Sequence, residues 1–202
     1  MWTTSIAISC RCGSLTGAVH PRGRVNRCVC YCDDCQAFAR FLKRQDEVLD
    51  DFGGTEIIHL SQGEVSLSKG TEQLACMRLT ANGTLRWYAG CCSTPIANTL
   101  PNRQIPVAGL VQSCLDVDQA ALDAALGPVD MQVFTKYALQ TPAPKMRGLV
   151  PGMARVLRVI LRARLHGDHH RSPFFHADTG KPVVVPKVLS DAERAEVKAG
   201  LV

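Results

Sequence analysis

The chain has 202 residues, 46% of them hydrophobic and 20% charged, which is typical of a globular protein with one sizeable domain or one domain plus an extension. No stretch reaches the roughly 18 apolar residues of a membrane span, and the first nine residues lack the basic and apolar regions of a secretory signal. We therefore expect a protein of the reducing cytoplasm, whose ten cysteines are better explained as metal ligands than as disulfides. The formal net charge of +5 falls if cysteines bind metal as thiolates, so it gives little support for a nucleic-acid partner.

Strand patterns dominate the first hundred residues. Alternation over residues 4–9 predicts a first strand, and residues 36–43 predict a short helix that Asp33 or Asp34 could cap. Further short strands are predicted at 56–60, 65–67, 73–79 and 84–88. Asn82-Gly83 predicts a hairpin between the last two, because both residues tolerate positive φ.

Helical patterns dominate beyond about residue 115. A helix is predicted over 116–126, where Gly127-Pro128 stops it, and Ser190 and Glu193 have the spacing of a capping box that starts a final helix. Between them, prolines at 142, 144 and 151 predict a loop before a basic amphipathic helix over 153–165. We expect this helix to pack its apolar stripe on its own domain; the stripe consists of Met153, Val156, Leu157, Ile160 and Leu161.

The most informative feature is the grouping of cysteines at metal-ligand spacing. The groups are Cys10-x-Cys12, then Cys28-x-Cys30-x-Cys32-x-x-Cys35, and finally Cys91-Cys92. Thiolates one or three residues apart can reach one ion, because a tight turn brings their sulfurs together. Zn²⁺ is the first candidate, since sulfur ligands are preferred in its tetrahedral structural sites. The spacing of the groups does not match the common runs of iron–sulfur proteins.

Two zinc sites are the simplest arrangement, although one ion remains an alternative. Cys10 and Cys12 need two more ligands, for which Cys91 and Cys92 are the obvious distant source. The remaining ligands, Cys30, Cys32 and Cys35, leave a fourth position open for water or substrate, which is the pattern of a catalytic zinc. Alternatively, Cys28 fills that position and makes the second site inert.

Several other residues could take part in binding or catalysis, but each has a simpler structural interpretation. Cys76 and Cys114 lie in apolar contexts and are expected to be buried small hydrophobes. Arg86 could meet an anionic substrate group, but we favour a cross-strand ion pair. Four histidines could form a metal site, but a solvated basic loop is favoured; they are His166, His169, His170 and His176.

The three cysteine groups, followed by Thr94-Pro95-Ile96, resemble the glutathione-dependent formaldehyde-activating enzyme family, which includes the centromere protein V domain. The resemblance covers roughly residues 5–112. It implies antiparallel β-sheets around zinc, a structural zinc held by Cys10 and Cys12, and a catalytic-type zinc held by Cys30, Cys32 and Cys35. With the patterns above, it predicts a mainly β zinc-binding domain over 1–115 and a mostly helical extension over 116–202 packed on it, α+β overall.

The chain departs from the family pattern at two places. Ala89 occupies the position of a family cysteine, for which Cys91 or Cys28 could substitute, and Cys92 matches the next cysteine. After Cys35, the small residues suited to glutathione are replaced by the bulky run of residues 37–41.

The resemblance implies a carbon–sulfur lyase of the kind that acts on glutathione–aldehyde adducts, with a small thiol or aldehyde as its substrate. The competing interpretation is a non-catalytic structural zinc module that binds a protein or nucleic-acid partner. A homodimer is one oligomeric state compatible with either.

Overall fold

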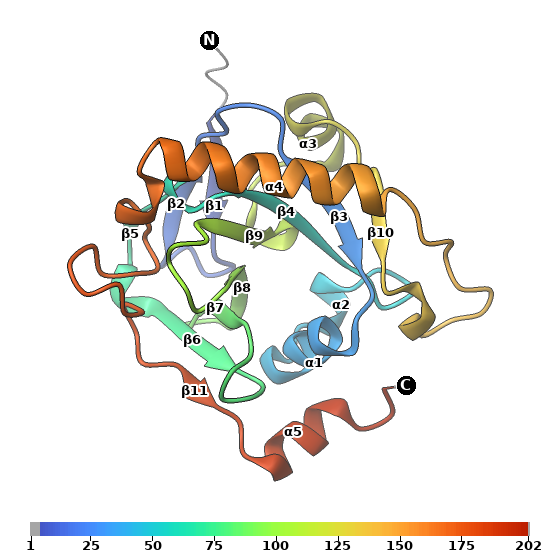
Figure 1. Cartoon of the computed structure of the whole chain (residues 1–202). Helices are drawn as coiled ribbons and strands as arrows, with labels where there is room; N and C mark the ends of the chain where they lie inside the picture. Colours follow the sequence, from blue (N-terminus) through green and yellow to red (C-terminus); the bar gives the residue numbers. More distant parts are fainter. Residues whose placement is uncertain (1–4, 202) are drawn as a thin grey trace.

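The fold is built on two β-sheets. The structure is a computed structural model that describes residues 5–201. The smaller sheet has the order β1-β2-β5, formed by Ile6–Ser9, Thr16–Val19 and Val65–Lys69. The larger sheet has the order β10-β3-β4-β9-β8-β7-β6-β11, formed by Met131–Val133, Asn26–Cys30, Thr55–Ser61, Val107–Val111, Thr94–Thr99, Leu85–Ala89, Leu74–Arg78 and Lys187–Val188. Figure 1 shows both sheets with the helices around them.

The strands at the two edges of the larger sheet come from the second half of the chain. β10 pairs in parallel with β3, and β11 pairs in parallel with β6, whereas the pairs between β3 and β6 are antiparallel. The α-helices are α1 (Asp33–Leu42), α2 (Gln45–Val48), α3 (Gln119–Leu126), α4 (Leu149–Leu165) and α5 (Asp191–Lys198). Single 3₁₀ turns lie at Gln62–Glu64, Thr71–Gln73, Gln112–Cys114, Thr135–Tyr137 and Asp168–His170. The predicted α+β class is confirmed.

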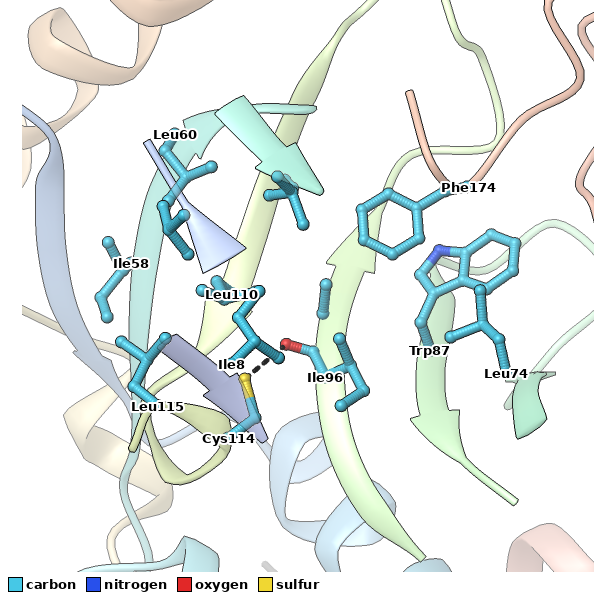
Figure 2. Packing of buried hydrophobic residues seen from close by; sticks show 14 of the residues in the cluster. Ile8, Ile58, Leu60, Leu74, Trp87, Ile96, Leu110, Cys114, Leu115 and Phe174 are labelled. Atoms are coloured by element: carbon cyan, nitrogen blue, oxygen red, sulfur yellow. Dashed lines mark hydrogen bonds between the residues drawn. The ribbon is translucent and has the colours of Figure 1, made fainter. Parts of the chain in front are cut away.

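The main core lies between the two sheets. Alternate residues of the larger sheet, such as Ile58 and Leu110, face side chains of the smaller sheet such as Ile8. Trp87 extends this core toward Phe174, whose ring centroid lies 5.1 Å away (Figure 2). Cys114 and Cys76 are buried within it, and the Cys114 thiol donates to the Ile96 carbonyl oxygen at 3.6 Å. Their expected role as small hydrophobic residues is confirmed.

Helices cover the opposite face of the larger sheet. α4 lies across β10, β3, β4 and β9 (Figure 1), while α1 and α5 pack on the β6 region with Phe38 and Met77 among their contacts. Gly152 lets α4 approach closely, because a Cβ at this position would collide with the Met131 sulfur and lie 3.1 Å from Asn26 Oδ1. Helices from both halves of the chain therefore cover this face of the sheet.

Two local expectations were wrong. The strands around Asn82-Gly83 do form a hairpin, but six residues connect β6 and β7 and neither Asn82 nor Gly83 has positive φ. α1 begins at Asp33 with Cys32 as its N-cap, so Asp33 and Asp34 do not cap it. Each of these carboxylates instead forms an ion pair with Lys198 of α5 at 2.7 Å. The Ser190–Glu193 capping box, by contrast, is confirmed.

The predicted burial of the apolar stripe of the amphipathic helix was wrong for Met153, Leu157 and Leu161, whereas Val156 and Ile160 are half-buried. α4 starts at Leu149, so Pro151 belongs to its first turn, where a missing N–H loses no helical bond. Its buried face is formed by Gly152, Val159 and Ala163, whereas more than half of the Met153, Leu157 and Leu161 side chains is exposed. The stripe was predicted from the helical period alone, whereas the face of α4 that packs on the sheet is the one with smaller residues.

An arginine buried between β3 and α3 stabilises the junction of the two halves of the chain. Arg27 is 1% exposed, and its guanidinium donates to Glu56 and Asp123 at 2.6 Å and to the Gly127 carbonyl oxygen. We expect Arg27→Ala to lower the free energy of unfolding by about 3 kcal/mol, because the change removes a buried charged donor that connects Glu56, Asp123 and the Gly127 carbonyl oxygen.

Urea denaturation measures this loss. The matched control is Arg24→Ala, because Arg24 is largely exposed and its ion pair with Asp130 spans 3.3 Å; it should change stability by less than about 1 kcal/mol. Equal effects of the two variants would contradict a special role for the buried network.

Within residues 5–201, the helices are too short or too polar to cross a bilayer.

Candidate metal centres

Four cysteine sulfurs converge where the end of β1 meets the turn after β7. Cys10 and Cys12 follow β1, and Cys91 and Cys92 follow β7; their four sulfurs lie within 4.8 Å of one another. The Cys91 sulfur lies 3.8 Å from Cys10, 3.4 Å from Cys12 and 3.8 Å from Cys92. Four sulfurs about 2.3 Å from a tetrahedral zinc are about 3.8 Å apart. This four-sulfur group therefore has the size of a structural zinc site.

Neighbouring groups contact these sulfurs and favour the thiolate forms of Cys12 and Cys92, whereas burial and the adjacent sulfurs raise the pKa of Cys91 to about 12. The Leu15 N–H donates to Cys10 Sγ at 3.2 Å, and Thr94 Oγ1 lies 3.1 Å from Cys92 Sγ. The pKa of Cys12 is lowered to about 6, chiefly because the Ser14 side chain hydrogen-bonds its thiolate. Ser93 adopts a left-handed φ of 58°, which turns the chain directly after the adjacent cysteine pair. These contacts favour metal binding, because ligands must be deprotonated.

Three further sulfurs meet where β3 leads into α1. Cys30 ends β3, Cys32 is the N-cap of α1 and Cys35 lies in its first turn; their sulfurs lie within 4.8 Å of one another. Cys30 and Cys35 are buried, but Cys32 is only half-buried, so this three-sulfur group reaches solvent on one side. The helix N-terminus adds positive potential there, which stabilises thiolates.

Within the three-sulfur group only the pKa of Cys35 is lowered, whereas hydrogen bonds to neighbouring sulfurs and burial raise the pKa of Cys30 and Cys32. The pKa of Cys35 lies well below the usual range because Cys30 and Cys32 hydrogen-bond its thiolate, and the Arg86 guanidinium adds a positive charge, although burial opposes the shift.

Arg86 is a buried cation beside the three-sulfur group. It is 5% exposed, and its Nη1 donates to Asn98 Oδ1 at 3.2 Å and points at Cys35 Sγ at 3.9 Å. Its cross-strand neighbour is the neutral Asn98, and across residues 5–201 no carboxylate lies within ion-pair distance of it, so the expected cross-strand ion pair was wrong. A buried charge requires a partner. Three thiolates around a divalent ion carry one net negative charge, which this guanidinium would balance.

Cys28 lies apart from the three-sulfur group. It belongs to the same strand face as Cys30, but its sulfur contacts His59 Nδ1 at 4.0 Å, and the same nitrogen lies 3.1 Å from Asn26 Nδ2. Burial raises the pKa of Cys28 to about 12 and lowers the pKa of His59 to about 4, so both side chains are neutral near pH 7. In this arrangement the fourth position at Cys30, Cys32 and Cys35 is not supplied by Cys28.

The described residues hold two groups of three or more potential ligand atoms within 4.8 Å, namely the four-sulfur and three-sulfur groups. The cluster His166, His169, His170 and His176 forms no such group, although the rings of His169 and His170 lie 4.1 Å apart. Metal binding at the two cysteine groups is thus compatible with the geometry.

Comparison with known proteins identifies a family without a known activity. The model of DUF6151, described as a family of unknown function, matches residues 2–186. The chain belongs to DUF6151. No curated protein matches the chain. A crystal structure of a Rhodobacter sphaeroides protein from a structural genomics programme is 17% identical, has a TM-score of 0.38, and covers 57% of this chain and 94% of its own.

Arg86 is the residue of this DUF6151 chain that sequence reasoning undervalued. We predict that Arg86→Met lowers the zinc affinity of the three-sulfur group 10- to 100-fold, because a supporting charge beside the ligands is lost. Competition with a chromophoric chelator measures this affinity. Arg86→Lys keeps the charge and should retain most of it, and the four-sulfur group should be unaffected. Unchanged affinity in Arg86→Met would contradict the charge-balancing role.

Proposed function

We propose that the chain is a zinc protein of a reducing compartment, in which the three-sulfur group promotes carbon–sulfur bond formation or cleavage between a small thiol and an aldehyde. The observation that carries the proposal is that the group has three converging sulfurs and no fourth protein ligand among residues 5–201, next to the buried Arg86, which has no carboxylate partner among the same residues. A structural site needs four protein ligands, whereas a reactive one keeps a place for substrate.

Zinc held by Cys30, Cys32 and Cys35 would supply Lewis acidity to the reacting oxygen or sulfur atom. In the forward reaction, the thiol sulfur bonds to the aldehyde carbon, and the thiol proton ends on the former carbonyl oxygen, giving a hemithioacetal; cleavage is the reverse. Arg86 keeps a positive charge beside the three-sulfur group, and its hydrogen bond to Asn98 Oδ1 orients the guanidinium. Neutral Cys28 and His59 would add no competing charge.

The resemblance to glutathione-dependent formaldehyde-activating enzymes supports this reaction class, and we propose that the two share an origin for their cysteine sites. Glutathione itself is a poor match for this chain. Phe38 is buried, and both Phe38 and Phe41 contact the Tyr88 ring edge-on, at centroid distances of 6.5 and 5.8 Å. Phe38 and Phe41 belong to α1, and their rings pack against Tyr88 of β7. The segment after Cys35 therefore offers no cradle of small residues.

Metal analysis of the purified protein tests the proposal. We expect two zinc ions per chain, and X-ray absorption at the zinc edge should show one with four sulfurs and one with three sulfurs and a lighter atom. Added small thiol should replace that lighter atom. Two fully sulfur-ligated ions that do not respond to thiol would refute the open site.

A structural zinc module that binds a partner is the second candidate. It is favoured by apolar side chains on the outer side of α4, where more than half of Leu157, Leu161 and Leu165 is exposed. The same absorption spectra decide between the two candidates, because a non-catalytic module requires a filled second site.

A further inference from the structure

A pocket of about 410 Å³ lies on the helix-covered face of the larger sheet, directly beside the three-sulfur group. Cys30 belongs to both the pocket wall and the sulfur group. Its volume falls within the roughly 300–1,000 Å³ of small-molecule sites. The pocket therefore gives a bound molecule direct access to the metal ligands.

The floor of the pocket is a row of residues paired across the strands. Asn98 of β8 lies opposite Gly109 of β9, which lies opposite His59 of β4. Gly109 keeps the floor open, since a Cβ there would stand 2.8 Å from Ile57 Cγ2. The same row continues to Arg86 at one end and Asn26 at the other. The polar groups of this row are already engaged with one another, His59 with Asn26 and Asn98 with Arg86. Thr84 and Thr99 add two hydroxyl groups to the lining.

The walls of the pocket are apolar. β10 contributes Met131 and Val133, Phe134 follows it, and α4 contributes one side with Met153, Val156 and Ile160. A second cavity of about 460 Å³ shares Met131, Val133, Phe134 and Met153 and extends along the start of α4 to Met146 and Leu149. Flexible methionines at the opening suit ligands of varied shape. Among residues 5–201, no Asp, Glu, Lys or Arg side chain lines the first cavity, which therefore suits an uncharged, apolar chain.

We propose that this pocket holds the alkyl or aromatic chain of the thiol or aldehyde substrate, with its reactive head group at Cys30. The proposal rests on the proposed function and specifies its substrate class: apolar rather than peptide-like. The second cavity would accommodate the continuation of longer chains.

Binding of a graded series of probes to the zinc-loaded protein tests this inference. Butane-1-thiol, hexane-1-thiol and hexan-1-ol are compared by calorimetric titration. Burial of one methylene improves binding about fourfold, so hexane-1-thiol should bind about 15-fold more tightly than butane-1-thiol. Hexan-1-ol has the same chain without a thiol and should bind more weakly than hexane-1-thiol.

Two matched variants test whether the gain in affinity with chain length arises in the pocket. Met153→Glu places a charge in the pocket wall, whereas Leu161→Glu places one on the same helix outside the pocket. Both side chains are similarly exposed, at 53% and 55%, so neither change should unfold the protein. Met153→Glu should abolish the gain from the longer chain, and Leu161→Glu should keep it.

The outcomes separate this inference from the function on which it rests. Equal affinity for both thiols, still dependent on zinc, would overturn the pocket and leave the zinc–thiol function standing. Hexan-1-ol that binds as tightly as hexane-1-thiol, and loses binding in Met153→Glu, would support the pocket and refute the thiol function. A dimer that Met153→Glu dissociates and Leu161→Glu does not would overturn the inference by assigning the pocket to a second copy of the chain.

Discussion

Replacing Cys12 with serine should lower the free energy of unfolding by more than about 4 kcal/mol. The Cys12 side chain is exposed, so its loss removes almost no packing, and a large effect must come from the metal that it helps to bind. Structural zinc contributes about 10–16 kcal/mol of binding free energy in small zinc domains. The four-sulfur group ties the end of β1 to the turn between β7 and β8, so its loss frees two distant segments together.

Thermal denaturation measures this effect. For a chain of this size, about 4 kcal/mol corresponds to a fall of roughly 8–16 °C in Tm. Cys12→His offers an alternative zinc ligand and should recover part of the stability. The neighbouring change Ser14→Ala is the matched control, because it alters a hydrogen bond to Cys12 without removing a ligand. If Cys12→Ser and Ser14→Ala were equally stable, the group would not hold a structural metal.

Exchanging Cys32 for serine should abolish metal binding at the three-sulfur group and reduce aldehyde–thiol activity by more than about 100-fold. Cys32 is the half-buried member of the group and stands at the N-terminus of α1, so the change affects the ligand set more than the core. The measurements are zinc content and the rate of hemithioacetal formation from an alkyl thiol and a small aldehyde.

Cys28→Ala provides the comparison that makes this test specific. Cys28 lies on the same strand face as Cys30, yet outside the sulfur group and beside His59. The Cys28→Ala variant should keep both zinc ions and most of the activity. Loss of one zinc in Cys28→Ala would mean that Cys28 closes the site, and the catalytic interpretation would then fail.

Sequence patterns predicted part of the local structure, namely β1, β4, β5, β6 and β7 and the helices α1, α3, α4 and α5. They missed the other six strands, among which β10 and β11 lie in the part of the chain where only helices were predicted. The errors occur where neighbours decide the outcome. Asp33 and Asp34 pair with Lys198, which is 164 or more residues away in the chain, and the stripe of α4 was misassigned because period alone does not show which face the sheet can accept.

The sequence by itself determined the grouping of Cys30, Cys32 and Cys35 and the pairs Cys10–Cys12 and Cys91–Cys92, because local turns bring ligands one to three residues apart together. Spacing alone failed for Cys28, which lies two residues from Cys30 in the extended strand β3 and stays outside the group. Only the tertiary structure decided which groups meet. The register of β7 and β8 and the position of β1 bring Cys91 and Cys92 to Cys10 and Cys12. Pairing across the sheet likewise places Arg86 at Cys35 and opens the pocket above Gly109. These relations depend on strand register and on packing between distant segments, which no short pattern encodes.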